Sequence, residues 1–269
     1  MRIGSRDFAT TGHTYIMGIL NVTPDSFSDG GKFNQIDAAL KHAEEMIRDG
    51  ADVIDIGGES TRPGYTKISD DEETGRVVPV IEAVKKEFGI PISVDTYKSG
   101  VAEAAAQAGA DLINDIWGLK YDPHMSEVIA KSGLACCLMH NRDNTEYRNF
   151  MEDMKQDLRE TIALAKAAGI ADDKIILDPG VGFAKSYENN LEVIRRLKEF
   201  NELKYPVLLG TSRKSVIGLT LDLPAAERVE GTIVTTVMAV EAGCMFVRVH
   251  DVKENHRAIQ MAEAILDRK

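Results

Sequence analysis

Short apolar runs alternate with longer amphipathic segments along the whole chain, and this alternation limits its fold more than any other feature. The candidate strands are Tyr15–Val22, Val53–Ile56, Ile92–Asp95, Leu112–Ile116, Ala135–Met139, Ile175–Leu177, Val207–Leu209 and Phe246–Val249. Several of these runs are continuously apolar, which is typical of strands buried on both faces of a parallel sheet. Segments such as Ile36–Asp49 and Leu158–Ala168 have the apolar spacing of helices.

Eight strand-then-helix units in a row can form a closed barrel or an open doubly wound sheet. The count of eight favours the barrel, and no Gly-x-Gly-x-x-Gly motif follows the first strand. The chain has 269 residues, a length that suits one barrel of the usual size, about 250 residues. We therefore predict an α/β fold, a (β/α)8 TIM barrel, in one domain over residues 1–269. Residues Arg2 to Thr14 are expected to form a short hairpin that closes the bottom of the barrel.

Turn and cap residues agree with this division of the chain. Glycines stand at the end of each of several amphipathic segments, where a left-handed C-cap favours them. They are Gly50, Gly89, Gly109, Gly133, Gly169 and Gly243. Ser69 with Glu72, and Asp251 with Glu254, have the spacing of a helix N-cap and capping box.

Composition excludes several classes of protein. The formal net charge is −11, which argues against a nucleic-acid partner, because such partners select a basic surface. No apolar run approaches the roughly 20 residues that span a bilayer, and the first seven residues lack an apolar signal core, so we expect a cytoplasmic protein. The three cysteines show no metal or redox spacing, and we expect them to be buried core residues.

Polar residues gather where the candidate strands end, the edge of a barrel at which active sites form. They are Asn21, Glu59, Ser60, Thr61, Arg62, Asp95, Asn114, Asp115, His140, Asp178, Arg213, Lys214, Ser215, Arg248 and His250. Burying so many polar groups near one axis is costly unless they meet a ligand or each other. The long loops Thr23–Phe33, Gly57–Ser69 and His140–Phe150 follow strands on this side. A site here is therefore the main functional prediction.

The chemistry of these residues indicates the kind of ligand. Asp95, Asn114 and Asp178 offer acceptors for the parallel N–H donors of an amino-pyrimidine edge. Positive charge for phosphate oxygens comes from Arg62, Arg213, Lys214, Arg248 and His250. Asn21 is a neutral oxygen ligand suited to a hydrated Mg²⁺ that is bound mostly by substrate phosphates. We expect a flat, donor-rich heterocycle that carries a phosphate or diphosphate.

Motifs of other chemistries are missing. The run from Gly210 to Ser215 ends like a phosphate loop but is too short for Gly-x-x-x-x-Gly-Lys-Ser. Neither a His-Glu-x-x-His zinc motif nor a Gly-x-Ser-x-Gly nucleophile elbow occurs. The sequence therefore favours electrostatic catalysis over covalent hydrolysis.

Seven segments resemble, in order, the signatures of the dihydropteroate synthase family. The first two are long and specific: the run from Met17 to Gly31, which contains Asn-Val-Thr-Pro-Asp-Ser-Phe-Ser-Asp-Gly-Gly, and Asp55-Ile56-Gly57-Gly58-Glu59-Ser60-Thr61-Arg62-Pro63-Gly64. The others lie at 93–96, 113–115, 177–183, 211–215 and 248–250. The resemblance covers essentially the whole chain, although the loop after the fifth strand matches no motif.

The resemblance implies that 6-hydroxymethyl-7,8-dihydropterin diphosphate reacts with p-aminobenzoate to give 7,8-dihydropteroate and pyrophosphate. It implies that Asp95, Asn114 and Asp178 bind the pterin, that Lys214 contacts its ring, and that Arg248 and His250 meet the diphosphate. It further implies Asn21 as the Mg²⁺ ligand, with Thr61 and Arg62 on the phosphates. The p-aminobenzoate pocket is implied to contain Phe27, Pro63, Arg62 and Ser215. A homodimer is implied by the resemblance alone.

A dissociative path suits this substrate, because loss of diphosphate leaves a methylene cation that the pterin ring delocalises. The leaving group would be stabilised by Mg²⁺, Arg248 and His250, and the cation by Asp95, Asp178 and Asp29. Three alternatives stay open: a methyltetrahydrofolate corrinoid methyltransferase, a pterin-binding protein without catalysis, and a phosphate-binding barrel isomerase or aldolase. His140 has no role in this scheme, and we expect it to be structural.

Overall fold

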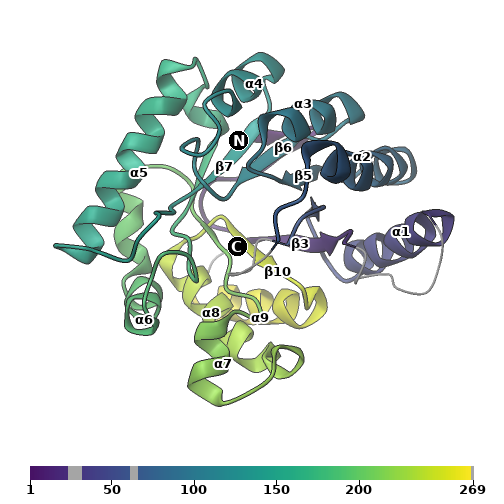
Figure 1. Cartoon of the computed structure of the whole chain (residues 1–269). Coiled ribbons are helices and arrows are strands. Elements are labelled where there is room, and N and C mark those ends of the chain that lie inside the picture. Colours follow the sequence, from purple (N-terminus) through teal and green to yellow (C-terminus); the bar gives the residue numbers. More distant parts are fainter. Residues whose placement is uncertain (24–31, 61–65, 268–269) are drawn as a thin grey trace.

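The chain folds into a parallel sheet that curves into a barrel, with helices around it (Figure 1). The computed structural model describes residues 1–23, 32–60 and 66–267. The barrel strands of this part are β3 (Tyr15–Asn21), β4 (Val53–Gly57), β5 (Ile92–Asp95), β6 (Leu112–Asp115), β7 (Ala135–Met139), β8 (Ile175–Asp178), β9 (Leu208–Leu209) and β10 (Phe246–Val249). Their order in the sheet is β8-β7-β6-β5-β4-β3-β10-β9, and a parallel bridge between Leu177 and Val207 joins the two ends. The predicted TIM barrel is confirmed.

The helices of the described residues follow the strands in turn. They are α1 (Lys32–Arg48), α2 (Asp70–Glu87), α3 (Ser99–Ala108), α4 (Met125–Ser132), α5 (Phe150–Ala167), α6 (Tyr187–Arg195), α7 (Ser215–Leu221), α8 (Val229–Ala242) and α9 (Val252–Ile265). Short 3-10 turns lie at η2 (Asp172–Lys174), η3 (Leu197–Leu203) and η4 (Ala225–Glu227). The amphipathic segment expected to begin at Leu158 is the second half of α5, whose earlier turns also bury Met151 and Met154.

The predicted caps are partly right. Gly109 ends α3 with a φ of 107°, and its N–H bonds the carbonyls of Ala105 and Ala106. Gly89 was expected to act in the same way, but α2 ends one residue earlier at an extended Phe88. Ser69 caps α2, because its side chain accepts a hydrogen bond from the N–H of Glu72 at 3.2 Å.

Asp251 stands at the N-cap position of α9 but makes no side-chain cap bond. Its carboxylate instead binds the guanidinium of Arg213, at 3.0 Å from Nε to Oδ2 and 2.5 Å from Nη2 to Oδ1. The expected capping role of this side chain is therefore wrong. A charged partner from the preceding strand-end loop provides a stronger hydrogen bond than a backbone N–H does.

The N-terminal residues form the expected hairpin, with β1 (Arg2–Ile3) antiparallel to β2 (Arg6–Asp7). Ile3 and Phe8 are buried in a separate apolar cluster inside the lower end of the barrel. That cluster also contains Met17, Val53, Leu112, Ala135, Cys137, Ile176, Leu208, Met245 and Phe246. The hairpin therefore seals the N-terminal ends of the strands with packed side chains.

The larger apolar cluster lies between the barrel and its helices, where both faces of the strands are covered. All barrel strands run parallel, so their C-terminal ends point the same way. The polar strand-end residues are thereby gathered at the end of the barrel opposite the hairpin. Among the helices described, none is both long and apolar enough to cross a membrane.

Candidate active site

Strand register places three of the expected residues side by side. Asn21 pairs with Gly57, Gly57 with Asp95, and Asp95 with Asn114 across β3, β4, β5 and β6. Gly57 leaves a gap in this row: a Cβ there would lie 3.6 Å from the Asp95 Cβ and 3.7 Å from the Asn21 Oδ1. Asn21 and Asp95 therefore approach each other over a position that has no side chain.

Arg248 crosses the barrel mouth and holds two carboxylates. Its Nε donates to Oδ2 of Asp55 at 2.6 Å, and its Nη2 donates to Oδ2 of Asp95 at 2.7 Å. Three buried oxygens beside this pair have no hydrogen-bond partner among the described residues: Oδ1 of Asp55, Oδ1 of Asp95 and Oγ of Ser93. Because a buried polar atom without a partner is costly, the Asp95 oxygen, which stands at the strand end, is a candidate acceptor for a ligand.

Asp178 and Lys214 lie opposite each other across Gly210. A Cβ on Gly210 would lie 3.5 Å from Oδ2 of Asp178 and 3.9 Å from the Lys214 Nζ. The other oxygen of Asp178 accepts the N–H of Gly180 at 2.7 Å, and Lys214 donates to the carbonyl of Val181 at 2.5 Å. One oxygen of Asp178 is thus bound by its own loop, while the second faces the lysine side of the mouth.

Burial shifts the ionisation of these groups toward their neutral forms. It raises the pKa of Asp95 to about 7, although the Arg248 guanidinium opposes the shift. It raises the pKa of Asp178 as well, and it lowers the pKa of Lys214 to about 8. For Arg248, burial is outweighed by Asp55 and Asp95, so the pKa of its guanidinium lies above the usual value. The arginine is therefore a permanent charge, while Asp95 and Lys214 titrate close to neutrality.

His250 is held beside this group by Ser212. The Ser212 Oγ accepts the backbone N–H of His250 at 3.1 Å and lies 3.0 Å from the His250 Nδ1. The Ser212 hydroxyl can donate to Nδ1 or accept from it, so this contact orients the His250 ring in either tautomer. Ser215 is exposed at the first position of α7.

Arg213 differs from the expectation that it offers charge to a phosphate. Its guanidinium is paired with the carboxylate of Asp251 through two hydrogen bonds. The charge of Arg213 is thus balanced by a carboxylate of the protein, as the charge of Arg248 is by Asp55 and Asp95. Five other expected residues, Phe27, Asp29, Thr61, Arg62 and Pro63, lie outside the described residues.

The donors present fit a metal ion that arrives with a substrate. No cluster of three or more His, Cys, Asp or Glu that could hold a metal occurs within residues 1–23, 32–60 and 66–267. Asn21 supplies one neutral amide oxygen at the strand end, close to Asp95. One such ligand suits a Mg²⁺ whose remaining ligands are phosphate oxygens and water.

Sequence reasoning missed Asp55 and Lys185. Asp55 is fully buried inside the otherwise apolar strand β4. An acidic residue within an apolar strand sequence was the signal that could have marked it as a site residue. Lys185 donates to the carbonyls of Gly180 and Phe183 and to the Nδ1 of His140, all within 3.0 Å. No local pattern marks Lys185, because its partners come from two loops.

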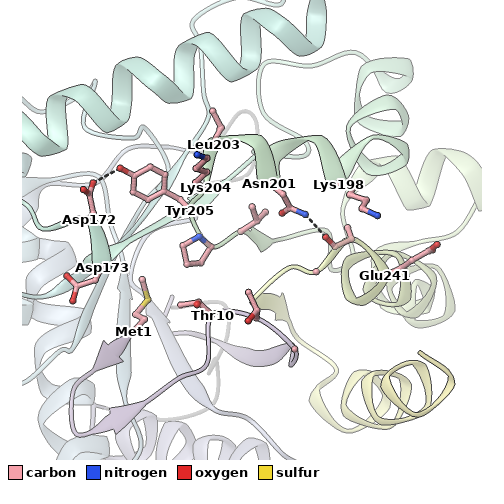
Figure 2. A pocket seen from close by; sticks show the side chains of 16 residues that line it. Met1, Thr10, Asp172, Asp173, Lys198, Asn201, Leu203, Lys204, Tyr205 and Glu241 are labelled. Carbon is pink, nitrogen blue, oxygen red and sulfur yellow. Dashed lines mark hydrogen bonds between the residues drawn. The ribbon is translucent and has the colours of Figure 1, made fainter. Parts of the chain in front are cut away.

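A second hollow lies away from these residues, beside the N-terminal hairpin and η3 (Figure 2). Its volume is about 970 Å³, and two of its polar side chains are bound within its lining. Asp172 accepts from Tyr205 and Lys166, and Asn201 donates to the carbonyl of Ala242. Among the residues that the structure describes, no strand-end residue lines the hollow, so we assign the chemistry to the opposite end of the barrel.

Comparison with known proteins identifies close relatives. The model of the family described as pterin binding enzyme matches residues 17–250. A dihydropteroate synthase from Clostridium beijerinckii is 62% identical over 269 residues, covering 100% of both chains. The crystal structure of dihydropteroate synthase from Clostridium difficile, in the presence of pteroic acid, matches with a TM-score of 0.93 and 52% identity over 100% of both chains. The Xanthomonas albilineans enzyme with 4-aminobenzoic acid has a TM-score of 0.90 and 40% identity, over 94% of this chain and 93% of that one.

Proposed function

The chain belongs to the dihydropteroate synthase family, and from this membership we propose how its own residues bind and activate the substrates. The enzyme is a transferase of folate biosynthesis that condenses 6-hydroxymethyl-7,8-dihydropterin diphosphate with p-aminobenzoate. Identity of 62% along the whole chain to a dihydropteroate synthase decides against the methyltransferase, the non-catalytic binding protein and the isomerase or aldolase.

The pterin would be bound through hydrogen bonds by Asp95, Asn114 and Asp178. The observation that carries this proposal is the buried Oδ1 of Asp95, which lacks a partner among the described residues while Oδ2 is held by Arg248. A carboxylate oxygen in that state is a strong acceptor for a ring N–H or amino group. Lys214 would contact the ring from the side of Asp178, where the two groups attract each other.

The diphosphate would lie over Arg248 and His250, with Thr61 and Arg62 completing its binding site. Asp55 and Asp95 hold the Arg248 Nε and Nη2, so the remaining N–H groups of the guanidinium are left to reach the leaving group. Ser212 holds the Nδ1 side of the His250 ring, and the Nε2 side would meet the diphosphate. Asn21 would ligate Mg²⁺, which supplies charge stabilisation for the departing diphosphate.

A dissociative reaction fits this distribution of charge. The bond between the methylene carbon and the diphosphate oxygen breaks, its electron pair leaves with the diphosphate, and the cation is delocalised over the pterin. Asp95, Asp178 and Asp29 would stabilise the cation. The amine nitrogen of p-aminobenzoate then forms the C–N bond and loses a proton, so no strong enzyme base is required. Phe27, Pro63, Arg62 and Ser215 would form the pocket that presents the amine.

The reaction is tested by incubating the protein with dihydropterin diphosphate and Mg²⁺, with and without p-aminobenzoate, and measuring pyrophosphate and dihydropteroate. We expect amine-dependent formation of both products in equal amounts. The dissociative step is tested with ¹⁸O in the oxygen that bridges carbon and phosphorus. Scrambling of the label into non-bridging positions of the substrate before net reaction supports the cation. Recovered substrate that keeps the label in the bridging position contradicts the dissociative step.

We also propose that residues 1–269 act as one domain and that the enzyme is a homodimer. Four apolar side chains on the neighbouring helices α7, α8 and α9 are more than half exposed: Leu219 (68%), Val234 (60%), Met261 (62%) and Ile265 (70%). Apolar side chains concentrated on adjoining helices are typical of a surface that a second copy covers. Sedimentation of wild type and Val234→Glu should give a dimer and a monomer, respectively, and a monomeric wild type overturns the proposal.

Two further expectations follow the chemistry of the chain. The three cysteines are free and buried, as in proteins of a reducing compartment, which supports a cytoplasmic location. The net charge of −11 supports small-molecule substrates rather than nucleic acid as partners.

A further inference from the structure

The loop that follows β8, residues 179–185, contacts Lys214 of the proposed pterin site through two groups. It begins directly after Asp178, its Val181 carbonyl accepts from Lys214, and its Phe183 ring lies 4.8 Å from the Lys214 Nζ. The backbone at Gly180 restricts its conformation. Gly180 has a φ of 68°, and a Cβ there would lie 2.1 Å from the His140 carbonyl oxygen. The loop conformation therefore controls where Asp178 and Lys214 stand.

The ammonium of Lys185 binds this loop from within. It donates to the carbonyls of Gly180 and Phe183, each at 2.9 Å, and lies 3.0 Å from the Nδ1 of His140. A lysine ammonium has three N–H donors, and these three acceptors use all of them. Two carbonyls separated along the loop are thereby tied to one amine, whose pKa burial lowers to about 7.

His140 connects Lys185 to the loop after β7. Because Nδ1 accepts from the ammonium, the imidazole is the neutral tautomer with its proton on Nε2, which donates to Oδ2 of Asp157 at 2.8 Å. Burial lowers the pKa of His140 to about 4, which agrees with a neutral ring. Arg142 donates to the same Asp157 oxygen at 2.5 Å. The chain of contacts thus reaches from α5 to the β8 loop.

Tyr147 adds a second support from the same loop. Its hydroxyl donates to the Ala184 carbonyl at 2.8 Å, next to the carbonyl that Lys185 binds. The Gly180, Val181, Phe183 and Ala184 carbonyls are thus bound by side chains of Lys185, Lys214 and Tyr147. The segment 140–149, which no sequence motif explained, supports the loop that carries Asp178.

We propose that Lys185, oriented by His140 and Asp157, is a positioning residue that holds the loop after β8 in the conformation that binds the pterin. The inference rests on the proposed pterin site, since Asp178 and Lys214 are the groups it positions. Lys185 is not a catalytic residue here, because its three donors are bound to the protein. Its loss should weaken pterin binding more than p-aminobenzoate binding, which depends on other loops.

The first test replaces Lys185 with Met, which keeps the aliphatic stem and removes the ammonium. We expect KM for dihydropterin diphosphate to rise about ten-fold, with KM for p-aminobenzoate at saturating pterin changed less than about two-fold. Lys174→Met is the matched control, because Lys174 also donates to a backbone carbonyl, that of Arg2 at 3.3 Å, but at the other end of the barrel. Equal increases in both KM values, or the same change in the control, overturn the proposal.

A chemical rescue distinguishes the effect of the Lys185 ammonium from the effect of its side-chain packing. Lys185→Cys treated with 2-bromoethylamine regains an ammonium at nearly the same reach. Cys136, Cys137 and Cys244 are buried, and burial raises the pKa of each thiol, so wild type treated alike should keep its activity. We expect alkylation of the variant to restore KM for the pterin substrate to within about three-fold of wild type. Failure to restore it, at full alkylation and unchanged folding, contradicts the proposal.

His140 gives a second pair of variants should the Lys185 substitutions fold poorly. In His140→Asn the side-chain oxygen stands near the position of Nδ1 and can accept from Lys185, whereas in His140→Gln the amide reaches instead toward Asp157. We expect KM for dihydropterin diphosphate to be lower in His140→Asn than in His140→Gln. Equal behaviour of the two variants overturns the assignment.

Hydrogen exchange without substrates distinguishes this inference from the pterin site itself. Lys185→Met should speed exchange of the Gly180 and Gly182 amides, which bond Asp178 and Asn190, while the β5 and β6 amides stay protected. Unchanged loop exchange overturns the role of Lys185 whatever the ligand. Failure of wild type to bind pterin would instead overturn the proposed site.

Discussion

Arg248 donates from Nη2 to Oδ2 of Asp95 at 2.7 Å, across 153 residues of sequence, while Oδ1 of Asp95 has no partner among the described residues. The guanidinium therefore orients the carboxylate so that one oxygen belongs to the protein and the other is left for a ligand. One side chain thus serves both the structure of the barrel and the binding of a ligand.

Replacing Asp95 or Asp178 with Asn should lower kcat/KM for the pterin substrate. Each change removes at least one charge-assisted hydrogen bond, about 1.5–3 kcal/mol, which is about ten- to 150-fold in kcat/KM. Steady-state kinetics measure the loss, and calorimetric titration with a pterin lacking diphosphate assigns it to binding. Full activity in both variants would mean that the pocket assignment is wrong.

The pH dependence of kcat/KM should be a narrow bell. Asp95 must be ionised to accept from the ring, and its pKa is raised to about 7, so activity should fall as the pH drops below that value. Lys214 and the positioning residue Lys185 must be protonated, and burial lowers their pKa values to about 8 and about 7, so activity should fall again as the pH rises above neutrality. In Asp95→Asn the acid limb should move or vanish while the alkaline limb stays. An unchanged acid limb in that variant would assign it to another group.

Stability should depend on pH in the opposite sense to activity at Asp95. The folded pKa of about 7 lies above the value of 3.8 for an Asp in an unfolded chain, so between these values the folded state retains a proton that the unfolded state has lost. The unfolding free energy therefore falls as the pH rises through this window, by the linkage between proton binding and folding. Urea unfolding at pH 5 and pH 8 should show a smaller decrease for Asp95→Asn than for wild type. A larger decrease in the variant contradicts the raised pKa.

Asp55→Asn should impair use of the diphosphate more than binding of the pterin ring. Asp55 holds the Arg248 Nε at 2.6 Å, and its loss lets the guanidinium turn away from the leaving group. We expect kcat/KM to fall about ten-fold, with the Kd of a pterin without diphosphate changed less than about three-fold. Asp52→Asn is the matched control, because Asp52 pairs with Arg6 at the opposite end of the barrel. Equal losses of kcat/KM in the two variants would contradict the role assigned to Asp55.

Phe8→Ala should destabilise the fold without altering the chemistry. Phe8 is 3% exposed and packs on Phe246 at a ring-centroid distance of 5.5 Å, inside the sealed end of the barrel. Truncating a buried Phe costs about 3–5 kcal/mol, measured by urea unfolding. KM for both substrates should stay within about two-fold of wild type, since the site lies at the other end of the strands. A large change in KM with little loss of stability would contradict this separation.

Much of the architecture could be read from local pattern. Apolar runs such as Ile92–Asp95 and Ala135–Met139 were placed with their observed bounds, because a strand buried on both faces needs a continuous apolar sequence. The same pattern put Asp95 and Asn114 at strand ends. Parallel strands in a barrel bring such ends together whatever the details of packing.

Side-chain partners could not be read in this way. Arg213 and Asp251 each have a plausible local role, as an anion ligand and as a helix cap, yet they neutralise each other across 38 residues. Lys185 has no local motif at all, and its function becomes visible once His140 is found 3.0 Å away.

The sequence by itself determined the order of the strands, the barrel they form and the polar residues at their ends. Tertiary structure decided which of those residues are bound to one another and which remain open to a ligand. The physical reason is that strand formation depends on neighbours a few positions away, whereas a charge pair such as Asp55 with Arg248 forms across 193 residues. Such a pair depends on the register and closure of the whole barrel, which no local pattern encodes.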